Sequence, residues 1–315
     1  MKSLQKKLLL FVLVIILIMA VSSLGVGIIT SYLGLTKNVE NNLQASCEIA
    51  SESITANLKL LKQQISSVAG IEKQSGASAK EWLASQTYYM NLYGYEALSV
   101  VSASGAITST DSSLNGKNIA DKGYFQSALQ GEATVSTTEF DDAGELKVYA
   151  CARNSSGEVV MGTLDGMILT SFVENVTFGS TGNLYIIDGE GATIANKKTD
   201  MVQIRDNTIK NAETNSDLKG MAQVLTKMVS GESGVDRYRY NGVERICAYM
   251  PLDEIGGWSI GIVAPIQEMI SSIWETIAYM VAVTVVVLLV AAVLTLVMAK
   301  RIAIPLVNVT NRMQL

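Results

Sequence analysis

Two long apolar segments constrain this chain more than any other feature of its sequence. Residues 8–33 form 26 positions without a charged side chain, and residues 277–299 form 23. A helix rises about 1.5 Å per residue, so each segment is long enough to cross a bilayer core of roughly 30 Å. A signal peptide has a shorter apolar core of about 7–15 residues. We therefore expect two transmembrane helices, at 8–33 and 277–299.

Basic residues flank both apolar segments and predict their orientation. Residues 1–7 carry three lysines, and Lys300-Arg301 follow the second segment. Basic residues near the ends of a span are retained on the cytoplasmic side. We therefore expect a cell-membrane protein with two spans, with residues 1–7 and 300–315 in the cytoplasm and residues 34–276 outside it.

The charge balance of residues 34–276 argues against nucleic acid as a partner. Six of the 24 basic residues and none of the 29 acidic residues lie outside this region, which leaves it with a net charge of −11. Such a region has no general positive field for phosphates.

The sequence lacks the residue patterns that are typical of catalytic and metal sites. It contains no His, which excludes His-dependent catalytic triads and His-ligated metals. Its three cysteines, Cys47, Cys151 and Cys247, are too far apart in sequence for a metal motif and are expected to be buried. The acidic groups Asp141-Asp142 and Asp188-Gly189-Glu190-Gly191 are typical of turns. We expect no enzyme activity in residues 34–276, and neither a metal nor a cofactor.

The region between the spans begins with a helical pattern and continues with a repeated β pattern. Apolar residues recur every three or four positions over 35–70, which predicts a stalk helix that could pair with a second copy of the chain. Later, residues 97–107 are echoed by residues 183–193, and 145–167 by 243–266; each unit reads as strand, turn, strand. We therefore predict two tandem modules, at about 71–170 and about 171–265.

This order of elements resembles a double Cache (dCache) transmembrane chemoreceptor of the methyl-accepting chemotaxis protein type. Asp121-Lys122-Gly123-Tyr124-Phe125 is similar to the Asp-x-x-Tyr-Phe helix start of that family, and residues 301–306 (RIAIPL) are similar to the opening of a HAMP linker. The resemblance implies an α+β fold in which a long N-terminal stalk helix carries two tandem PAS-like (Cache) modules of antiparallel sheet, flanked by two transmembrane helices.

The resemblance also implies a function and a site. A small extracellular metabolite would bind in the membrane-distal module, and the second span would transmit the signal to HAMP and methyl-accepting regions in a homodimer that acts on a downstream kinase and adaptor. The positions implied to bind the ligand are Lys122, Tyr124, Phe125, Phe140, Asp142, Tyr149, Asp165 and Met167. Two other interpretations stay open, namely core packing for Tyr124, Phe125 and Tyr149 and a solvated helix start for Lys122.

The sequence departs from the amino-acid-binding version of the family at two positions. Lys122 stands where that version has an Arg that grips a carboxylate, and Met167 stands where it has an Asp. A lysine is a point charge and does not reproduce the guanidinium fork. We therefore expect another polar metabolite, such as a carboxylate or a nucleobase, rather than an α-amino acid.

Two alternatives to a chemotaxis receptor stay open at this point. The same sensor could be fused to a histidine kinase or a diguanylate cyclase, or the chain could be a membrane-tethered adhesion or structural protein whose pocket holds no ligand.

Overall fold

A computed structural model describes residues 2–179, 181–252 and 256–298 of the chain. The chain divides into two compact units, one made of Met1–Val39 with Gln267–Leu315 and the other of Glu40–Ile266, and each is described by itself. The predicted HAMP-like segment, 300–315, lies outside the described residues.

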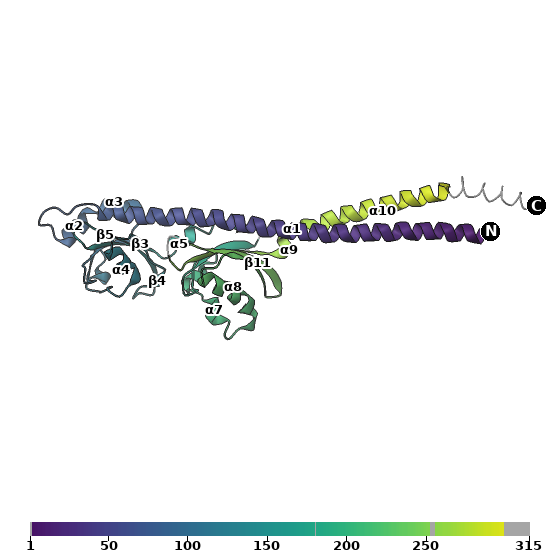
Figure 1. Cartoon of the computed structure of the whole chain (residues 1–315). Helices are drawn as coiled ribbons and strands as arrows, with labels where there is room; N and C mark the ends of the chain where they lie inside the picture. Colours follow the sequence, from purple (N-terminus) through teal and green to yellow (C-terminus); the bar gives the residue numbers. More distant parts are fainter. Residues whose placement is uncertain (1, 180, 253–255, 299–315) are drawn as a thin grey trace, which may run out of the picture. The chain divides into compact units, whose positions relative to one another are not determined.

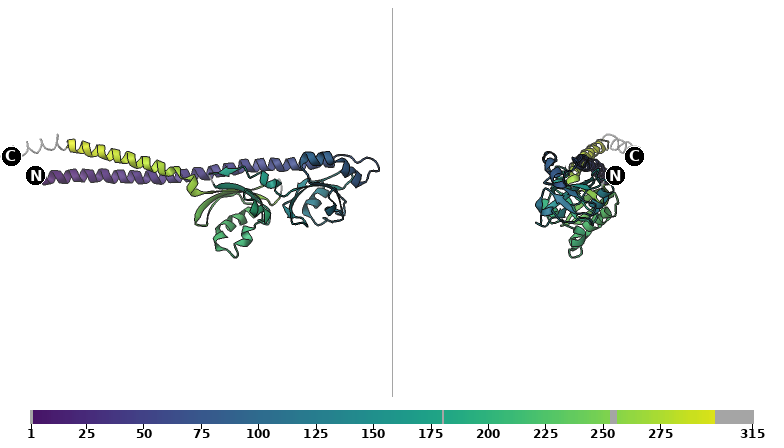
Figure 2. Two further views of the ribbon diagram at one scale, coloured as in Figure 1. Left: turned by 180° about the vertical axis from the view of Figure 1, so that it is seen from behind. Right: turned by 90° about the vertical axis from the view of Figure 1, so that its left-hand side faces the viewer.

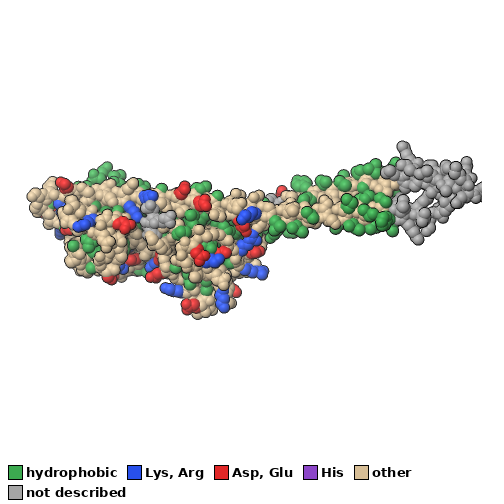
Figure 3. All heavy atoms as spheres, viewed as in Figure 1, with side chains coloured by type: hydrophobic (Ala, Val, Ile, Leu, Met, Phe, Trp, Pro, Cys, Tyr) green, Lys and Arg blue, Asp and Glu red, His purple; other side chains and the backbone are tan. Residues whose placement is uncertain are grey.

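Apolar helices make up the described part of the first unit. Helix α1 (Lys2–Ala69) begins there, and α9 (Ile266–Met269) is followed by α10 (Ser272–Met298). Two helical segments, Leu10–Ala69 and Ile273–Val297, are long and apolar enough to cross a membrane, and no residue of their most apolar windows is buried. Figure 3 shows this as hydrophobic side chains spread over the surface of these helices.

Polar side chains within these helices bond to the helix itself. The Thr30 hydroxyl donates to the Val26 carbonyl at 2.9 Å, and the Thr284 hydroxyl donates to the Met280 carbonyl at 2.8 Å. Such bonds satisfy these two hydroxyl donors in an apolar environment. Both helices are therefore candidate membrane spans.

The second unit begins with the remainder of α1, whose predicted apolar stripe is buried. The stripe positions are spaced by three or four residues, as expected for one face of a helix packed on its domain. The buried members are Leu43, Cys47, Ala50, Ile54, Leu58, Leu61, Ile65 and Val68.

Two six-stranded antiparallel sheets follow along the chain. We call the elements around the first sheet the first module and those around the second sheet the second module. The first sheet contains β1 (Ala97–Val101), β2 (Ile107–Ser109), β3 (Thr134–Val135), β4 (Glu139–Phe140), β5 (Leu146–Arg153) and β6 (Val159–Asp165). The second contains β7 (Thr177–Phe178), β8 (Gly182–Ile187), β9 (Thr193–Asn196), β10 (Gly234–Tyr240), β11 (Val243–Pro251) and β12 (Ser259–Pro265).

The two sheets share one topology, as the repeated sequence pattern predicts. The order β2-β1-β6-β5 in the first corresponds to β9-β8-β12-β11 in the second, with hairpins at equivalent places. In both, a glycine opposes a tyrosine ring: a Cβ at Gly162 would overlap the ring of Tyr95, and one at Gly261 would lie 2.5 Å from that of Tyr185. These glycines are therefore required by close packing and not by a turn.

Short helices connect and cover the sheets. In the first module they are α2 (Ala79–Ser85), α3 (Thr87–Tyr93), η1 (Ser112–Leu114), α4 (Gly123–Leu129) and α5 (Ile168–Ser171). In the second they are α6 (Thr199–Gln203), α7 (Thr208–Asn211), η2 (Ser216–Leu218) and α8 (Lys219–Val229).

Each module has its own apolar core on the face covered by a helix. Phe125 and Ala128 of α4 pack on one face of the first sheet, and Val224, Leu225 and Met228 of α8 pack on one face of the second. Figures 1 and 2 show α8 and α1 on opposite faces of the second sheet. The predicted α+β fold class, with a long helix and two antiparallel modules, is confirmed.

Candidate functional site

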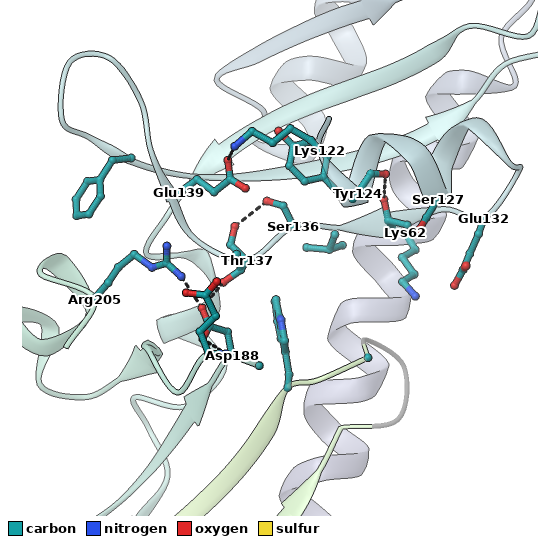
Figure 4. Close-up of a pocket in the computed structure, with 18 residues that line it drawn as sticks. Lys62, Lys122, Tyr124, Ser127, Glu132, Ser136, Thr137, Glu139, Asp188 and Arg205 are labelled. Carbon is teal, nitrogen blue, oxygen red and sulfur yellow. Dashed lines mark hydrogen bonds and ion pairs between the residues drawn. The ribbon is translucent and has the colours of Figure 1, made fainter. Parts of the chain in front are cut away.

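A cavity of about 830 Å³ lies where the two modules of the second unit meet. The first module contributes the start of α4 and the segment from Glu132 to Phe140, and the second contributes the β8–β9 turn, Arg205 and Trp258. Lys62 of α1 lines a further side. Figure 4 shows the labelled side chains surrounding this space.

An ion pair from the first module borders the cavity. Lys122 directly precedes α4, and its ammonium nitrogen lies 2.8 Å from a carboxylate oxygen of Glu139 on β4. Both side chains remain partly exposed, at 41% and 23%. Lys122 therefore presents a positive charge beside a negative one.

Aromatic side chains form the wall behind this pair. The ring of Tyr124 stacks on that of Tyr149, with centroids 5.6 Å apart and planes inclined by 19°. Burial, followed by the charge of Glu139, raises the pKa of Tyr149 to about 12. Burial likewise raises the pKa of Tyr124, so both hydroxyls are neutral near pH 7. The aromatic wall is therefore uncharged.

Hydrogen bonds fix the loop between β3 and β4 against this wall. The Ser136 hydroxyl accepts from the Tyr149 backbone N–H at 2.8 Å and donates to the Thr137 carbonyl at 2.7 Å. The Thr134 hydroxyl donates to the Tyr124 carbonyl at 2.9 Å. The loop that precedes Glu139 is thereby tied to the aromatic wall.

A second ion pair borders the cavity from the second module. Asp188 lies in the β8–β9 turn, and its side chain is only 5% exposed. One carboxylate oxygen accepts from the Arg205 guanidinium at 2.5 Å and from the Thr137 hydroxyl at 3.2 Å. Since Thr137 belongs to the first module, Asp188 links the two modules through a side chain of each.

The structure brings only some of the eight predicted site residues to this cavity. Lys122, Tyr124 and Phe140 line it. Tyr149 stands behind Tyr124, and Phe125 lies wholly in the core.

The three other predicted residues do not line this cavity. Asp142 pairs with Lys117 at 2.6 Å and its side chain is 85% exposed. Asp165 accepts from the Met167 backbone N–H at 2.7 Å, where the chain enters α5. The assignment of all eight residues to a binding site stays a prediction.

Several cavity residues were not found from the sequence. The turn interpretation of Asp188 is confirmed, because its other carboxylate oxygen accepts the backbone N–H groups of Glu190 and Ala192 at 3.0 Å each. That local pattern gave no sign of the contact with Thr137. No local sequence pattern pointed to Glu139, Arg205 or Trp258 as site residues.

The dCache_1 family model, a Cache domain, matches residues 28–273, and the chain therefore belongs to this family. No curated protein matches the chain.

Solved sensor domains of chemoreceptors share the fold. The sensory domain of Campylobacter jejuni Tlp3 with isoleucine bound has 12% identity and a TM-score of 0.55, over 75% of this chain and 96% of that one. The ligand-binding domain of Pseudomonas fluorescens CtaA in complex with L-isoleucine has 16% identity and a TM-score of 0.58, over 77% and 98%. That of Pseudomonas aeruginosa PctB in complex with L-Arg has 18% identity and a TM-score of 0.53, over 73% and 96%.

These comparisons correct one expectation from the sequence. We expected a carboxylate or nucleobase rather than an α-amino acid, and this is wrong, because sensor domains of this fold are solved with isoleucine, serine, arginine and glutamine bound. The expectation rested on the loss of a guanidinium fork at Lys122. An ammonium still offers a full positive charge to a carboxylate, so the exchange of one side chain does not exclude a ligand class.

Proposed function

We propose that this chain is the sensor and membrane portion of a transmembrane chemoreceptor, and that it binds an α-amino acid in the cavity between the two modules. Membership of the Cache family and the amino acids bound to solved sensors of the same fold support the proposal. The single observation that carries it is the Lys122–Glu139 pair at the cavity wall.

The two charges of this pair match the two charges of a free amino acid. The ligand carboxylate would face the Lys122 ammonium, and the ligand ammonium would face the Glu139 carboxylate. A partly exposed ion pair contributes about 0–1 kcal/mol, so exchanging it for two pairs with the ligand costs little. Tyr124 and Phe140 would contact the ligand side chain.

The loop between β3 and β4 offers a route from ligand to membrane. It leads into Glu139 on β4, and its Thr137 bonds to Asp188 of the second module. The last strand of that module, β12, leads directly into α9 and α10. A ligand shifts such a system only as far as it prefers one conformation over another.

The remaining parts of the proposal concern the membrane and the output. Two spans, at 8–33 and 277–299, would place the sensor outside the cell, and a homodimer would signal through HAMP and methyl-accepting regions. The alternative is a histidine kinase or diguanylate cyclase output on the same sensor. In either form, residues 34–276 would bind their ligand and not transform it.

Calorimetric titration of the full chain in lipid nanodiscs with the proteinogenic amino acids tests the proposal. We expect at least one amino acid to bind. We expect Lys122→Gln and Glu139→Gln each to weaken the binding of that amino acid by about tenfold or more, which corresponds to about 1.4 kcal/mol. Lys117→Gln is the matched control, since Lys117 pairs with exposed Asp142 outside the cavity lining. No binding, or equal binding by all variants, would contradict the proposal.

A further inference from the structure

A second cavity, of about 250 Å³, lies inside the second module. It is bordered by the sheet face formed by β8, β10, β11 and β12 and by the segments from α6 to α8 that cover this face. It shares no lining residue with the cavity between the modules. Because the two modules have the same topology, it occupies a position equivalent to the space between the first sheet and α4.

Arg245 supplies a positive charge at this cavity. It lies on β11, opposite Tyr238 of β10, and its guanidinium carbon is 5.5 Å from the centroid of the Tyr240 ring. Its Nε atom is buried and makes no hydrogen bond within the described part of the chain. A buried donor without a partner costs about 1–3 kcal/mol. Arg245 therefore lines this cavity with a hydrogen-bonding capacity that the described part of the chain does not meet.

The other polar groups at the cavity are mostly engaged with each other. The Asp206 carboxylate accepts from Asn211 at 2.8 Å and from Thr208 at 3.0 Å. The Asn183 amide donates to the Asn196 side-chain oxygen at 3.0 Å. An acidic group with both oxygens already engaged is a poor partner for a ligand cation. Two basic residues, Arg245 and Lys198, also line the cavity, and of these Arg245 has the buried donor without a partner within the described residues.

Apolar side chains line another part of the cavity. Ile187 and Val263 contribute from the sheet and Leu225 from α8. The formal charges at the lining are those of Lys198, Asp206 and Arg245, a net of +1. The volume is below the roughly 300–1,000 Å³ typical of sites for larger ligands.

We propose that this cavity is a second ligand site, which binds a small organic acid with one negative charge and a short apolar end. The acid group accepts from Arg245, and the apolar end contacts Leu225 and Val263. This site would be additional to the amino-acid site between the modules and would not depend on it.

Calorimetric titration of the full chain in nanodiscs with propionate tests this site. We expect propionate to bind and its neutral analogue propionamide to bind at least about tenfold more weakly, because only the acid carries the charge that Arg245 recognises. Arg245→Gln should weaken propionate by about tenfold or more. Equal binding of propionamide, equal binding of inorganic phosphate, or no propionate binding would overturn the proposal.

Two control variants locate the binding. Arg239→Gln removes an arginine from the neighbouring strand, where its Nε donates to the exposed Gly242 carbonyl, and should leave propionate binding unchanged. Lys122→Gln should also leave it unchanged, whereas a loss there would place propionate in the first cavity and overturn the proposal. If Arg245→Gln fails to fold, Met221→Trp decides: its much larger side chain narrows the cavity from α8 and should weaken propionate binding by about tenfold or more. Retained binding would overturn the site.

Discussion

Replacing Asp188 by Asn tests the contact that joins the two modules. The variant has almost the same shape and keeps the oxygen that accepts the backbone N–H groups of Glu190 and Ala192. It replaces the oxygen that accepts from Arg205 and Thr137 with an NH₂ group. The Arg205 guanidinium then faces a donor instead of a carboxylate.

The expected loss follows from the burial of this pair. The side chains of Asp188 and Arg205 are 5% and 23% exposed, so solvent screens the pair only weakly. Hydrogen bonds to charged groups contribute about 1.5–3 kcal/mol, and the loss of one partner leaves the other partly buried charge uncompensated. We expect the free energy of unfolding to fall by about 2–3 kcal/mol. For a unit of this size, that lowers the melting temperature by about 4–12 °C.

A second aspartate in the same unit provides the control. Asp142 pairs with Lys117 at 2.6 Å, but its side chain is 85% exposed. Exposed pairs of this kind contribute about 0.2–1 kcal/mol, so Asp142→Asn should barely change the melting temperature.

Thermal unfolding of the full chain in nanodiscs, followed by tryptophan fluorescence, measures both variants, because Trp258 lines the affected cavity. A double-mutant cycle with Arg205→Gln then isolates the pair. The reasoning is refuted if Asp188→Asn and Asp142→Asn melt at the same temperature.

Three further predictions concern packing, pH and thiol reactivity. Gly261→Ala places a methyl group 2.5 Å from the Tyr185 ring and should cost about 1–3 kcal/mol by chemical denaturation, whereas an unchanged midpoint would contradict the packing argument. Burial opposes ionisation of Asp236, but hydrogen bonds from Lys227 and Tyr249 outweigh it and lower the pKa of that carboxyl. The contribution of Asp236 to stability is thus complete above the unfolded pKa of about 3.9 and is lost as the pH falls through the lower folded pKa. In a curve of unfolding free energy against pH, Asp236→Asn should therefore reduce the loss of stability at acid pH. An equally steep loss in the variant would contradict the role of this ion pair. Burial raises the pKa of the Cys151 thiol, so a maleimide should label it at neutral pH only after denaturation, and rapid labelling of the native chain would contradict its burial.

Local patterns in the sequence were sufficient to predict the architecture. The period of the stripe from Leu43 to Val68 predicted the buried helix face, because a helix returns the same face every three to four residues. The echoed strand pairs predicted two modules, because each hairpin encodes its own turn and alternation. Gly162 and Gly261 stood at equivalent places in that echo, but only the structure gave the reason, which is a tyrosine ring packed over each.

The candidate site could be predicted only in part. The resemblance to the dCache family implied Lys122, Tyr124 and Phe140, and these three residues line the cavity. Residue type alone does not separate an aromatic in a core from one in a cavity wall, which is why core packing stayed open as an alternative for Phe125 and Tyr149.

By itself, therefore, the sequence determined the two apolar segments, the long helix and the paired modules, because each depends on neighbours a few residues apart. The tertiary structure decided which charges meet. Thr137 and Asp188 are 51 residues apart and belong to different modules, so their contact has no periodicity to reveal it. The same holds for Arg205 beside Asp188 and for the cavity around them, which exist only because two separately encoded modules pack against one another.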